Sequence, residues 1–248
     1  MTEPQRRLPV DGAVNVRDLG GYASLGGRQT RWGVFLRSDN LDKLTLADQR
    51  LLIDYGLRRI VDLRTARELD DNPDVFAQSS EVSYHHLPLI EDGPDMESLG
   101  TMQTHAEVYP TFLDRCQPAI RIILETLCTA DTVCTLYHCT GGKDRTGVVT
   151  ALLLGLVDVD DEIIAQDYAL TERYLAPRIA EWRQQVQEDG GDVERYDRLS
   201  ATPPQSMHHT LNHLKSEYGG VRDYVKAIGV DESDIEMLRR RFIVTERA

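Results

Sequence analysis

The sequence predicts an α/β fold with a central, mostly parallel sheet flanked by helices. Short runs rich in β-branched and aromatic residues alternate along the chain with longer stretches of helical spacing. Strands that alternate with helices are typical of parallel sheets, because parallel neighbours need long crossover connections. A chain of 248 residues with 41% hydrophobic residues is also long enough to bury a sizeable core. We therefore expect a single domain over residues 1–248.

The N-terminal third predicts extended segments followed by a helix. Residues 14–22 and 32–37 have the composition of extended chain, and the glycine pair at 26–27 marks a turn between them. Residues 45–55 predict a helix, with Thr45 as its N-cap and Gly56 as its C-cap.

The middle of the chain predicts the core of the sheet. Residues 59–63 and 82–87 predict strands, and a short helix is expected at 65–70. Residues 88–100 predict an acidic loop. Residues 109–129 are mostly helical in pattern, with a break at Pro118. Residues 131–137 predict a buried strand, and the apolar run at 146–157 predicts a buried helix.

Residues 160–218 predict three further helices. Asp160 is a suitable N-cap for an amphipathic helix that ends at 175. Pro177 opens a second helix to about 188. The Asp-Gly-Gly-Asp segment at 189–192 breaks that helix, and residues 206–218 form the third.

The loop between the strand at 131–137 and the following helix has the composition of a phosphate-binding site. Residues 138–147 read His-Cys-Thr-Gly-Gly-Lys-Asp-Arg-Thr-Gly. Helix N-termini bind anions through unsatisfied N–H groups, and Gly141 and Gly142 allow successive amides to point inward. Arg145 has the fork that binds two phosphate oxygens, and Lys143 adds a second positive charge. We expect Thr140 to belong to the same anion-binding loop.

Cys139 is the predicted nucleophile of this loop. The pKa of a thiol at a helix N-terminus or beside cations is lowered, which favours the reactive thiolate. The Thr146 hydroxyl is expected to donate to the sulfur, and His138 to orient the loop through backbone carbonyls. A structural thiol at a strand end is the alternative. A nucleotide P-loop is excluded, because Tyr137 replaces its first glycine and Asp144 follows the lysine.

With this loop, the chain resembles the cysteine-dependent tyrosine and dual-specificity phosphatases, in particular the bacterial family that includes the mycobacterial tyrosine phosphatase B. The His-Cys-five-residues-Arg-Thr loop is specific for the mechanism, and the Gly-Lys-Asp-Arg-Thr-Gly ending is similar to the bacterial family. Four other segments also resemble that family: 15–22 (Asn-Val-Arg-Asp-Leu-Gly-Gly-Tyr), 36–44, 60–64 and 219–229.

The resemblance implies the cysteine-dependent tyrosine phosphatase fold and a two-step reaction. In that reaction Cys139 forms a cysteinyl-phosphate, water hydrolyses it, and Arg145 and the loop amides hold the oxygens without a metal or cofactor. Family members act on phosphotyrosine, and some also accept phosphoserine, phosphothreonine or phosphoinositides. The resemblance further implies that residues 160–218 are a helical lid inserted in the domain. Ordinary packing on the sheet edge is the alternative.

The general acid is left open between two aspartates. The chain has no Trp-Pro-Asp tripeptide, which marks the acid loop of many tyrosine phosphatases. Asp144 lies in the loop, and Asp62 ends the strand at 59–63. Both also have a structural interpretation: Asp62 as a partner of Arg17, Arg64 or Arg145, and Asp144 as a partner of Lys143. A general acid needs a raised pKa, whereas neighbouring cations lower it.

Composition limits the other classes of function. A formal net charge of −13 argues against a nucleic-acid partner. The four cysteines form no Cys-x-x-Cys pair, so no metal site is expected, and His208, His209 and His213 are interpreted as a solvated helix face. Without an apolar leader or a span of about 20 apolar residues, we expect a cytoplasmic protein without membrane insertion, although leaderless export stays possible.

Three hypotheses for the function remain at this point. The first is a phosphorylated protein, with phosphotyrosine favoured, and the second is a phosphoinositide, sugar phosphate or nucleotide. The third is a phosphate-binding module without turnover. A deep slot lined by aromatic residues such as Tyr22 or Tyr109 would favour phosphotyrosine. A second cysteine, such as Cys134, is a candidate for reversible disulfide protection of Cys139. The sequence does not specify an oligomeric state.

Overall fold

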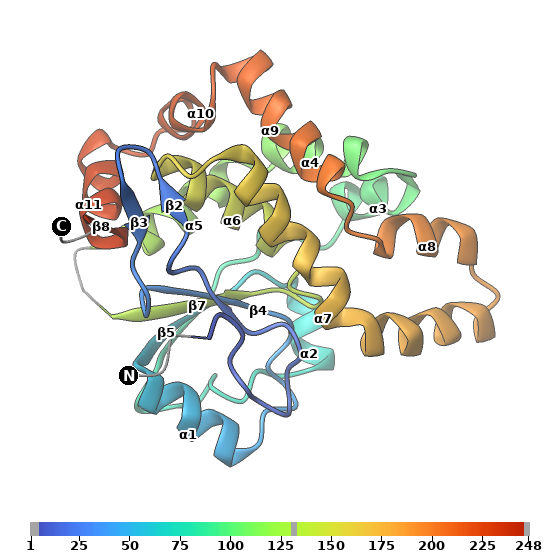
Figure 1. Ribbon diagram of the computed structural model, residues 1–248. Coiled ribbons are helices and arrows are strands. Elements are labelled where there is room, and N and C mark those ends of the chain that lie inside the picture. Colours follow the sequence, from blue (N-terminus) through green and yellow to red (C-terminus); the bar gives the residue numbers. More distant parts are fainter. Residues whose placement is uncertain (1–4, 130–132, 246–248) are drawn as a thin grey trace.

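The computed structural model describes residues 5–129 and 133–245 and contains a five-stranded sheet in the order β1-β4-β7-β5-β6. Strands β4, β7, β5 and β6 run parallel, and β1 is antiparallel at one edge. The strands are β1 (Arg17–Asp18), β4 (Phe35–Ser38), β5 (Leu57–Asp62), β6 (Ser83–His86) and β7 (Cys134–His138). Helices lie on both sides of this sheet (Figure 1), as predicted for the fold class.

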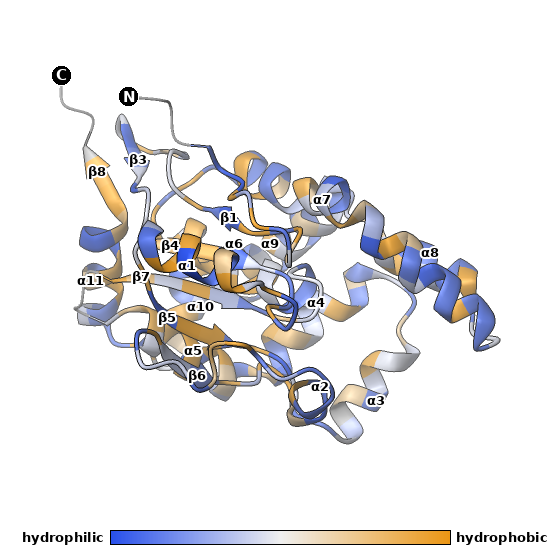
Figure 2. Ribbon diagram, turned by 90° about the horizontal axis from the view of Figure 1, so that it is seen from below, coloured by the Kyte–Doolittle hydropathy of each residue, from blue (hydrophilic) through white to orange (hydrophobic). Residues whose placement is uncertain are grey.

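The two faces of the sheet are covered by two separate hydrophobic clusters. Successive residues of a strand point to opposite faces, so neighbours divide between the clusters. Leu36 and Leu136 pack in the cluster beside α1 (Leu46–Tyr55), whereas Phe35 and Tyr137 pack in the larger cluster. Most of the helices contribute side chains to that larger cluster, among them α4 (His105–Arg115), α5 (Gln117–Leu127), α6 (Asp144–Leu156) and α9 (Pro204–Tyr218). Figure 2 shows the hydrophobic character of β5 at the centre of the molecule.

The register of the central strands places their carboxyl ends at one edge of the sheet. His138, the last residue of β7, pairs with Ser38 of β4 on one side and Asp62 of β5 on the other. The loop that follows β7 therefore starts where three parallel strands end, which is where α/β proteins build their sites.

Both ends of α1 are fixed by capping residues in its own sequence. The Thr45 hydroxyl accepts from the Asp48 amide at 3.1 Å, and the Asp48 carboxylate accepts from the Thr45 amide at 2.9 Å. Gly56 ends α1 in the left-handed conformation at φ 115°. Both predicted caps are confirmed.

A small antiparallel sheet lies beside the main one. It contains β2 (Ala23–Ser24), β3 (Arg28–Thr30) and β8 (Ile243–Thr245) in the order β2-β3-β8. Gly26 and Gly27 make the turn between β2 and β3 at positive φ, and a turn was predicted there. The three strands of this sheet were not predicted. The remaining short helices are α2 (Ala66–Asp71), α10 (Val221–Ala227) and α11 (Glu232–Phe242).

Two of these predictions are wrong. Residues 88–100 were expected to form a loop, but α3 (Pro94–Thr101) begins with Pro94, a residue suited to the first turn of a helix. Pro177 was expected to start a helix, but α7 (Asp161–Glu188) continues through it. The predicted break at 189–192 is confirmed, and the segment after it, for which no element was predicted, forms α8 (Val193–Ser200), capped by Asp192. The break near Pro118 is confirmed, because Pro118 lies in the first turn of α5. Residues 131 and 132 of the strand predicted at 131–137 lie outside the described residues.

Candidate active site

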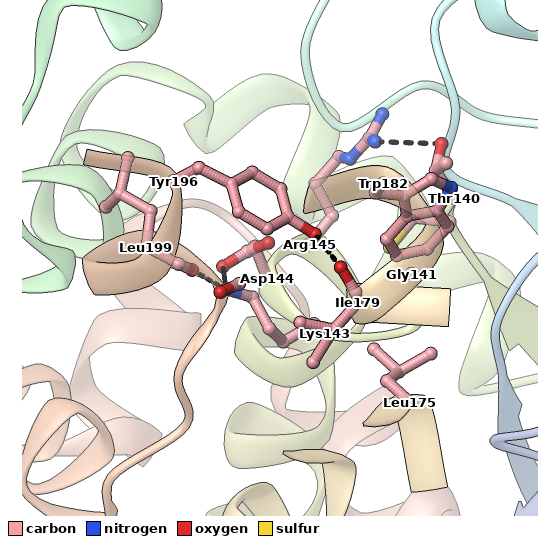
Figure 3. Close-up of a pocket in the computed structure, with 12 residues that line it drawn as sticks. Thr140, Gly141, Lys143, Asp144, Arg145, Leu175, Ile179, Trp182, Tyr196 and Leu199 are labelled. Carbon is pink, nitrogen blue, oxygen red and sulfur yellow. Dashed lines mark hydrogen bonds and ion pairs between the residues drawn. The ribbon is translucent and has the colours of Figure 1, made fainter. Parts of the chain in front are cut away.

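The loop after β7 forms the floor of a pocket of about 420 Å³. Helix α6 begins at Asp144, so the loop runs directly into a helix N-terminus, two residues earlier than predicted. The wall opposite the loop belongs to α7 and α8, and Figure 3 shows the two helices facing the loop. The lining residues are Cys139, Thr140, Gly141, Lys143, Asp144, Arg145, Leu175, Ile179, Trp182, Tyr196, Leu199 and Ser200.

Cys139 lies at the base of this pocket and is 2% exposed. The Thr146 hydroxyl donates to its sulfur at 3.2 Å, which is the contact predicted for that residue. His138, Gly142 and Thr146 do not line the pocket, but they support the loop from the protein side. Gly142 has φ 62°, and a Cβ at this position would lie 2.3 Å from the carbonyl oxygen of Ser38. Glycine is therefore required there by both conformation and space.

Arg145 lines the pocket while its guanidinium is held by Glu68 of α2. Its two terminal nitrogens donate to the two Glu68 oxygens at 2.5 and 2.7 Å. Burial alone would lower the pKa of Arg145, but the Glu68 hydrogen bonds and the charge of Cys139 outweigh burial and raise it. The Thr140 hydroxyl also donates to Glu68. Glu68 thus holds the side chains of Arg145 and Thr140 in place together. Nε of Arg145 takes no part in these hydrogen bonds.

Glu68 was missed by the sequence analysis, although a signal for it was present. Thr65 and Glu68 have the spacing of a capping box, and the structure contains both of its hydrogen bonds. A capping box predicts only the start of α2. The second role of Glu68 depends on the proximity of α2 to the phosphate loop, which local sequence does not specify.

Asp144 is the candidate acid that the structure brings to the pocket. Its carboxylate accepts from the Tyr109 hydroxyl at 2.7 Å and lies 3.2 Å from Nζ of Lys143. Burial raises the pKa of Asp144, but the charges of Lys143 and His105 outweigh this effect and lower it. Asp144 is therefore an ionised carboxylate in the structure.

Asp62 lies outside the pocket and has the alternative, structural role. Its oxygens accept from Arg64 at 2.6–3.0 Å and from the Tyr84 hydroxyl at 2.6 Å. Asp62 is fully buried, and its pKa is lowered because the charge of His138 and these partners outweigh burial. Of the three arginines considered as its partner, the structure shows Arg64.

His138 lies in a buried carboxylate environment behind the loop. Its Nε2 is 3.1 Å from Asp74 and 3.7 Å from Asp62, and its Nδ1 is 3.3 Å from the carbonyl of Cys139. Burial lowers the pKa of His138, but the charges of Asp62 and Asp74 outweigh burial and raise it. Ligand atoms of Asp62, Asp74 and His138 lie as close together as those of a metal site. These residues do not fit a metal ion, because the Asp62 carboxylate already accepts hydrogen bonds from Arg64 and Tyr84.

Lys143 connects the loop to α8. Its ammonium donates to the carbonyl of Leu199, near the C-terminus of α8, and lies 3.2 Å from Nε2 of His105. The His105 ring also bonds the Leu199 carbonyl at 2.9 Å and Ser206 at 3.0 Å. A phosphate-binding role for Lys143 stays a prediction, and in the structure its ammonium holds the wall of the pocket in place.

The aromatic wall comes from residues other than those suggested by the sequence. Trp182 of α7 and Tyr196 of α8 line the pocket, and the Tyr196 hydroxyl donates to the carbonyl of Ile179 at 3.2 Å (Figure 3). Tyr22 instead donates to Asp167, and Tyr109 is buried against Asp144.

Other predicted features lie away from the pocket. His208 and His213 bond Glu162 and Asp114, in keeping with a solvated helix face. All four cysteines are free thiols, so disulfide protection of Cys139 stays a prediction. Among the described residues, no helix is both long and apolar enough to span a bilayer.

The comparisons with known proteins agree with this geometry. The model of a family described as the tyrosine phosphatase family matches residues 8–244. A tyrosine-protein phosphatase of Nostoc commune is 32% identical, over 84% of this chain and 73% of its own length. The triple specificity protein phosphatase PtpB of Mycobacterium tuberculosis is 27% identical, over 94% and 97%.

A crystal structure of a cysteine-to-serine variant of P. aeruginosa TpbA, in complex with phosphotyrosine, aligns over 97% of each chain, with 15% identity and a TM-score of 0.34. At this score the two folds are only loosely similar. The family match instead covers almost the whole chain, including the phosphate loop and the pocket wall made by α7 and α8. The chain therefore belongs to the tyrosine phosphatase family, whose members are phosphoric monoester hydrolases.

Proposed function

We propose that the chain hydrolyses phosphotyrosine in proteins through a cysteinyl-phosphate intermediate. The observation that carries this proposal is the pocket that joins Cys139, Arg145 and an aromatic wall. Sulfur attacks phosphorus, the bond to the tyrosine oxygen breaks, and water then releases phosphate from Cys139. The loop amides and Arg145 hold the phosphoryl oxygens in both steps, as electrostatic stabilisation requires.

Asp144 is the proposed proton donor to the tyrosine oxygen, because it lines the pocket and Asp62 does not. The cations beside Asp144 keep it ionised without substrate. A bound phosphate dianion opposes those cations and raises the pKa of Asp144, so that the carboxyl takes up a proton when it is needed.

The wall favours an aryl ester over a phosphorylated polyol. Leu175, Ile179 and Trp182 of α7 line the pocket together with Tyr196 of α8, and these side chains offer apolar surface to a bound ring. A tyrosine ring gains from such burial, whereas the hydroxyl groups of an inositol or a sugar would lose hydrogen bonds to water.

We further propose that the lid is shorter than residues 160–218. Helix α9 contributes Met207, Leu211 and Leu214 to the core, so it belongs to the body of the domain. The second half of α7 and all of α8 form a hairpin that projects from the body (Figure 1) and supplies the pocket wall. Lys143 fastens this hairpin at Leu199.

The test compares matched substrates in EDTA with a reductant. We expect the wild type to hydrolyse a phosphotyrosine peptide and Cys139→Ser to be inactive. Trp182→Ala should lower kcat/KM for the phosphotyrosine peptide by about tenfold and should change hydrolysis of the matching phosphoserine peptide much less. Trp182→Phe is the control that keeps an aromatic wall. A higher kcat/KM for inositol or sugar phosphates than for the phosphotyrosine peptide would overturn the substrate assignment. A folded wild type without activity on any of these substrates would overturn the proposal that the protein is a catalyst.

A further inference from the structure

Three successive carbonyl groups of the phosphate loop are held from outside the loop. The Thr140 carbonyl accepts from the Asn40 amide at 3.0 Å. The Asn15 side-chain amide donates to the carbonyls of Gly141 and Gly142 at 3.2 and 3.3 Å. A trans peptide places its N–H opposite its C=O. Carbonyls that are held toward the protein therefore leave the following N–H groups directed at the cavity.

Arg37 makes the shortest of these contacts and joins the loop to α7. One terminal nitrogen donates to the Gly142 carbonyl at 2.7 Å, and the other donates to Asp167 at 2.6 Å. Asp167 is fully buried, so water does not compete for its carboxylate and the ion pair holds the Arg37 guanidinium in place. The contact at Gly142 matters because this residue has φ 62° and packs against the backbone of Ser38.

Arg17 completes the network on the opposite side of Asp167. It donates to the Asp167 backbone carbonyl at 3.0 Å, and its other terminal nitrogen donates to the side-chain oxygen of Asn15. That second bond fixes which end of the Asn15 amide points at the loop. The network also explains why Asn15 and Arg17 stand two residues apart: both belong to one chain of donors that ends on the loop carbonyls.

The charges of the network favour an anion in the loop. Arg17 and Arg37 share one carboxylate, Asp167, and all three side chains are buried. Burial raises the pKa of Asp167, but the two arginines outweigh burial and lower it, so the carboxylate is charged. Two cations against one anion leave a positive charge beneath Gly142, and a phosphate dianion in the loop compensates it.

We propose that Asn15 and Arg37 are positioning residues for the phosphate loop, which hold its amides in the geometry that binds the transferred phosphoryl group. The expected effect of Asn15 and Arg37 on turnover rests on the proposed function. Their expected effect on oxyanion binding does not depend on it.

The experiment measures binding of tungstate, a phosphate mimic, by titration calorimetry, beside kcat and the melting temperature. In Arg37→Lys the charge is kept, but one ammonium cannot bond Gly142 and Asp167 in the two directions of a guanidinium. Asn15→Ala removes the second donor. We expect both variants to weaken tungstate binding and to lower kcat by about 10- to 100-fold, as for lost charge-assisted or buried hydrogen bonds.

Tyr22→Phe is the matched control, because the Tyr22 hydroxyl bonds Asp167 and its side chain makes no hydrogen bond to the described residues of the loop. It should lower the melting temperature while tungstate affinity stays near that of the wild type. The proposal is overturned if Arg37→Lys and Asn15→Ala bind tungstate like Tyr22→Phe at comparable stability. If Arg37→Lys does not fold, Asn15→Ala decides alone. A wild type that binds tungstate without turnover would refute the proposed function and leave the positioning role open to the same comparison.

Discussion

Thr146 donates to the sulfur of Cys139 at 3.2 Å, and this one contact acts on the second half of the proposed reaction. When water attacks the cysteinyl-phosphate, the sulfur leaves with negative charge, and a hydroxyl donor stabilises that charge. We expect Thr146→Val to slow hydrolysis of the intermediate by about 10- to 100-fold, the range of one hydrogen bond to a charged group. Rapid-quench measurement should then show the phosphoenzyme accumulating. Thr146→Ser should restore most of the rate, and an unchanged steady state in Thr146→Val would contradict the role.

Glu68 gives the protein a defined acid sensitivity. Burial raises the pKa of its carboxyl, but the hydrogen bonds and charge of Arg145 outweigh burial and lower it to about 2. An unfolded glutamate titrates near about 4.3, so the ion pair stabilises the fold above that pH. This contribution is lost as the pH falls from about 4.3 toward about 2.

Urea unfolding between pH 2 and pH 6 measures this effect. The difference in unfolding free energy between the wild type and Glu68→Gln should be largest above about pH 4.5 and should shrink as the pH falls. Glu97→Gln, at an exposed position of α3, is the control and should follow the wild type at every pH. A constant difference across the range would show that the Glu68 charge does not contribute.

At this scale the loop was predictable and its surroundings were not. The residue types at 138–147 indicate the nucleophile, the arginine and the hydroxyl donor, because their chemistry depends on spacing along a few residues. Glu68, Trp182 and Tyr196 reach the same site from three different helices. Their roles depend on how those helices pack, so no local pattern reveals them.

At the scale of elements, α7 contains a proline in its interior. Pro177 has no N–H for the carbonyl of Arg173, and its ring crowds the preceding turn, at a cost of about 3 kcal/mol in an ordinary helix. The sequence therefore predicted a helix start at this point. Packing overrides that preference, because Leu175, before the proline, and Ile179 and Trp182, after it, all face the pocket.

Pro177→Ala should increase the free energy of unfolding by about 1–3 kcal/mol, because the missing hydrogen bond is restored. Urea unfolding followed by circular dichroism measures it. Ala180→Gly, on the exposed side of the same helix, is the opposite control and should lower stability by about 1 kcal/mol. A loss of stability in Pro177→Ala would mean that the packing of α7 requires the shape that the proline imposes.

The remaining elements show where local signals suffice. Helix α1 carries both of its caps in its own sequence, and the turn before β3 is set by Gly26 and Gly27. Strand β8 is short within the described residues, and its pairing with β3 is what makes it a strand. A pairing between segments so distant along the chain has no signature in either segment alone.

For the whole molecule, the formal net charge of −13 opposes an anionic substrate. The positive potential at Arg145 and at the α6 N-terminus acts at short range, whereas the net charge acts over the Debye length of about 10 Å at 0.1 M salt. We expect kcat/KM for a phosphotyrosine peptide with acidic flanks to rise by a few fold between about 10 and 150 mM salt. A peptide with basic flanks should show the reverse trend. Equal salt dependence for the two peptides would contradict long-range repulsion.

Strand β8 also has a consequence for the order of events during synthesis. It pairs with β3, close in sequence to the segment that holds Asn15 and Arg17, and it leaves the ribosome long after β3. Asp167, the shared partner of Arg17 and Arg37, likewise emerges long after them. A nascent chain can therefore display Asn15, Arg17 and Arg37 early, but it cannot assemble the network around the phosphate loop until Asp167 has emerged. We expect the growing chain to stay inactive on the ribosome and to acquire its phosphatase activity only when these late segments have emerged.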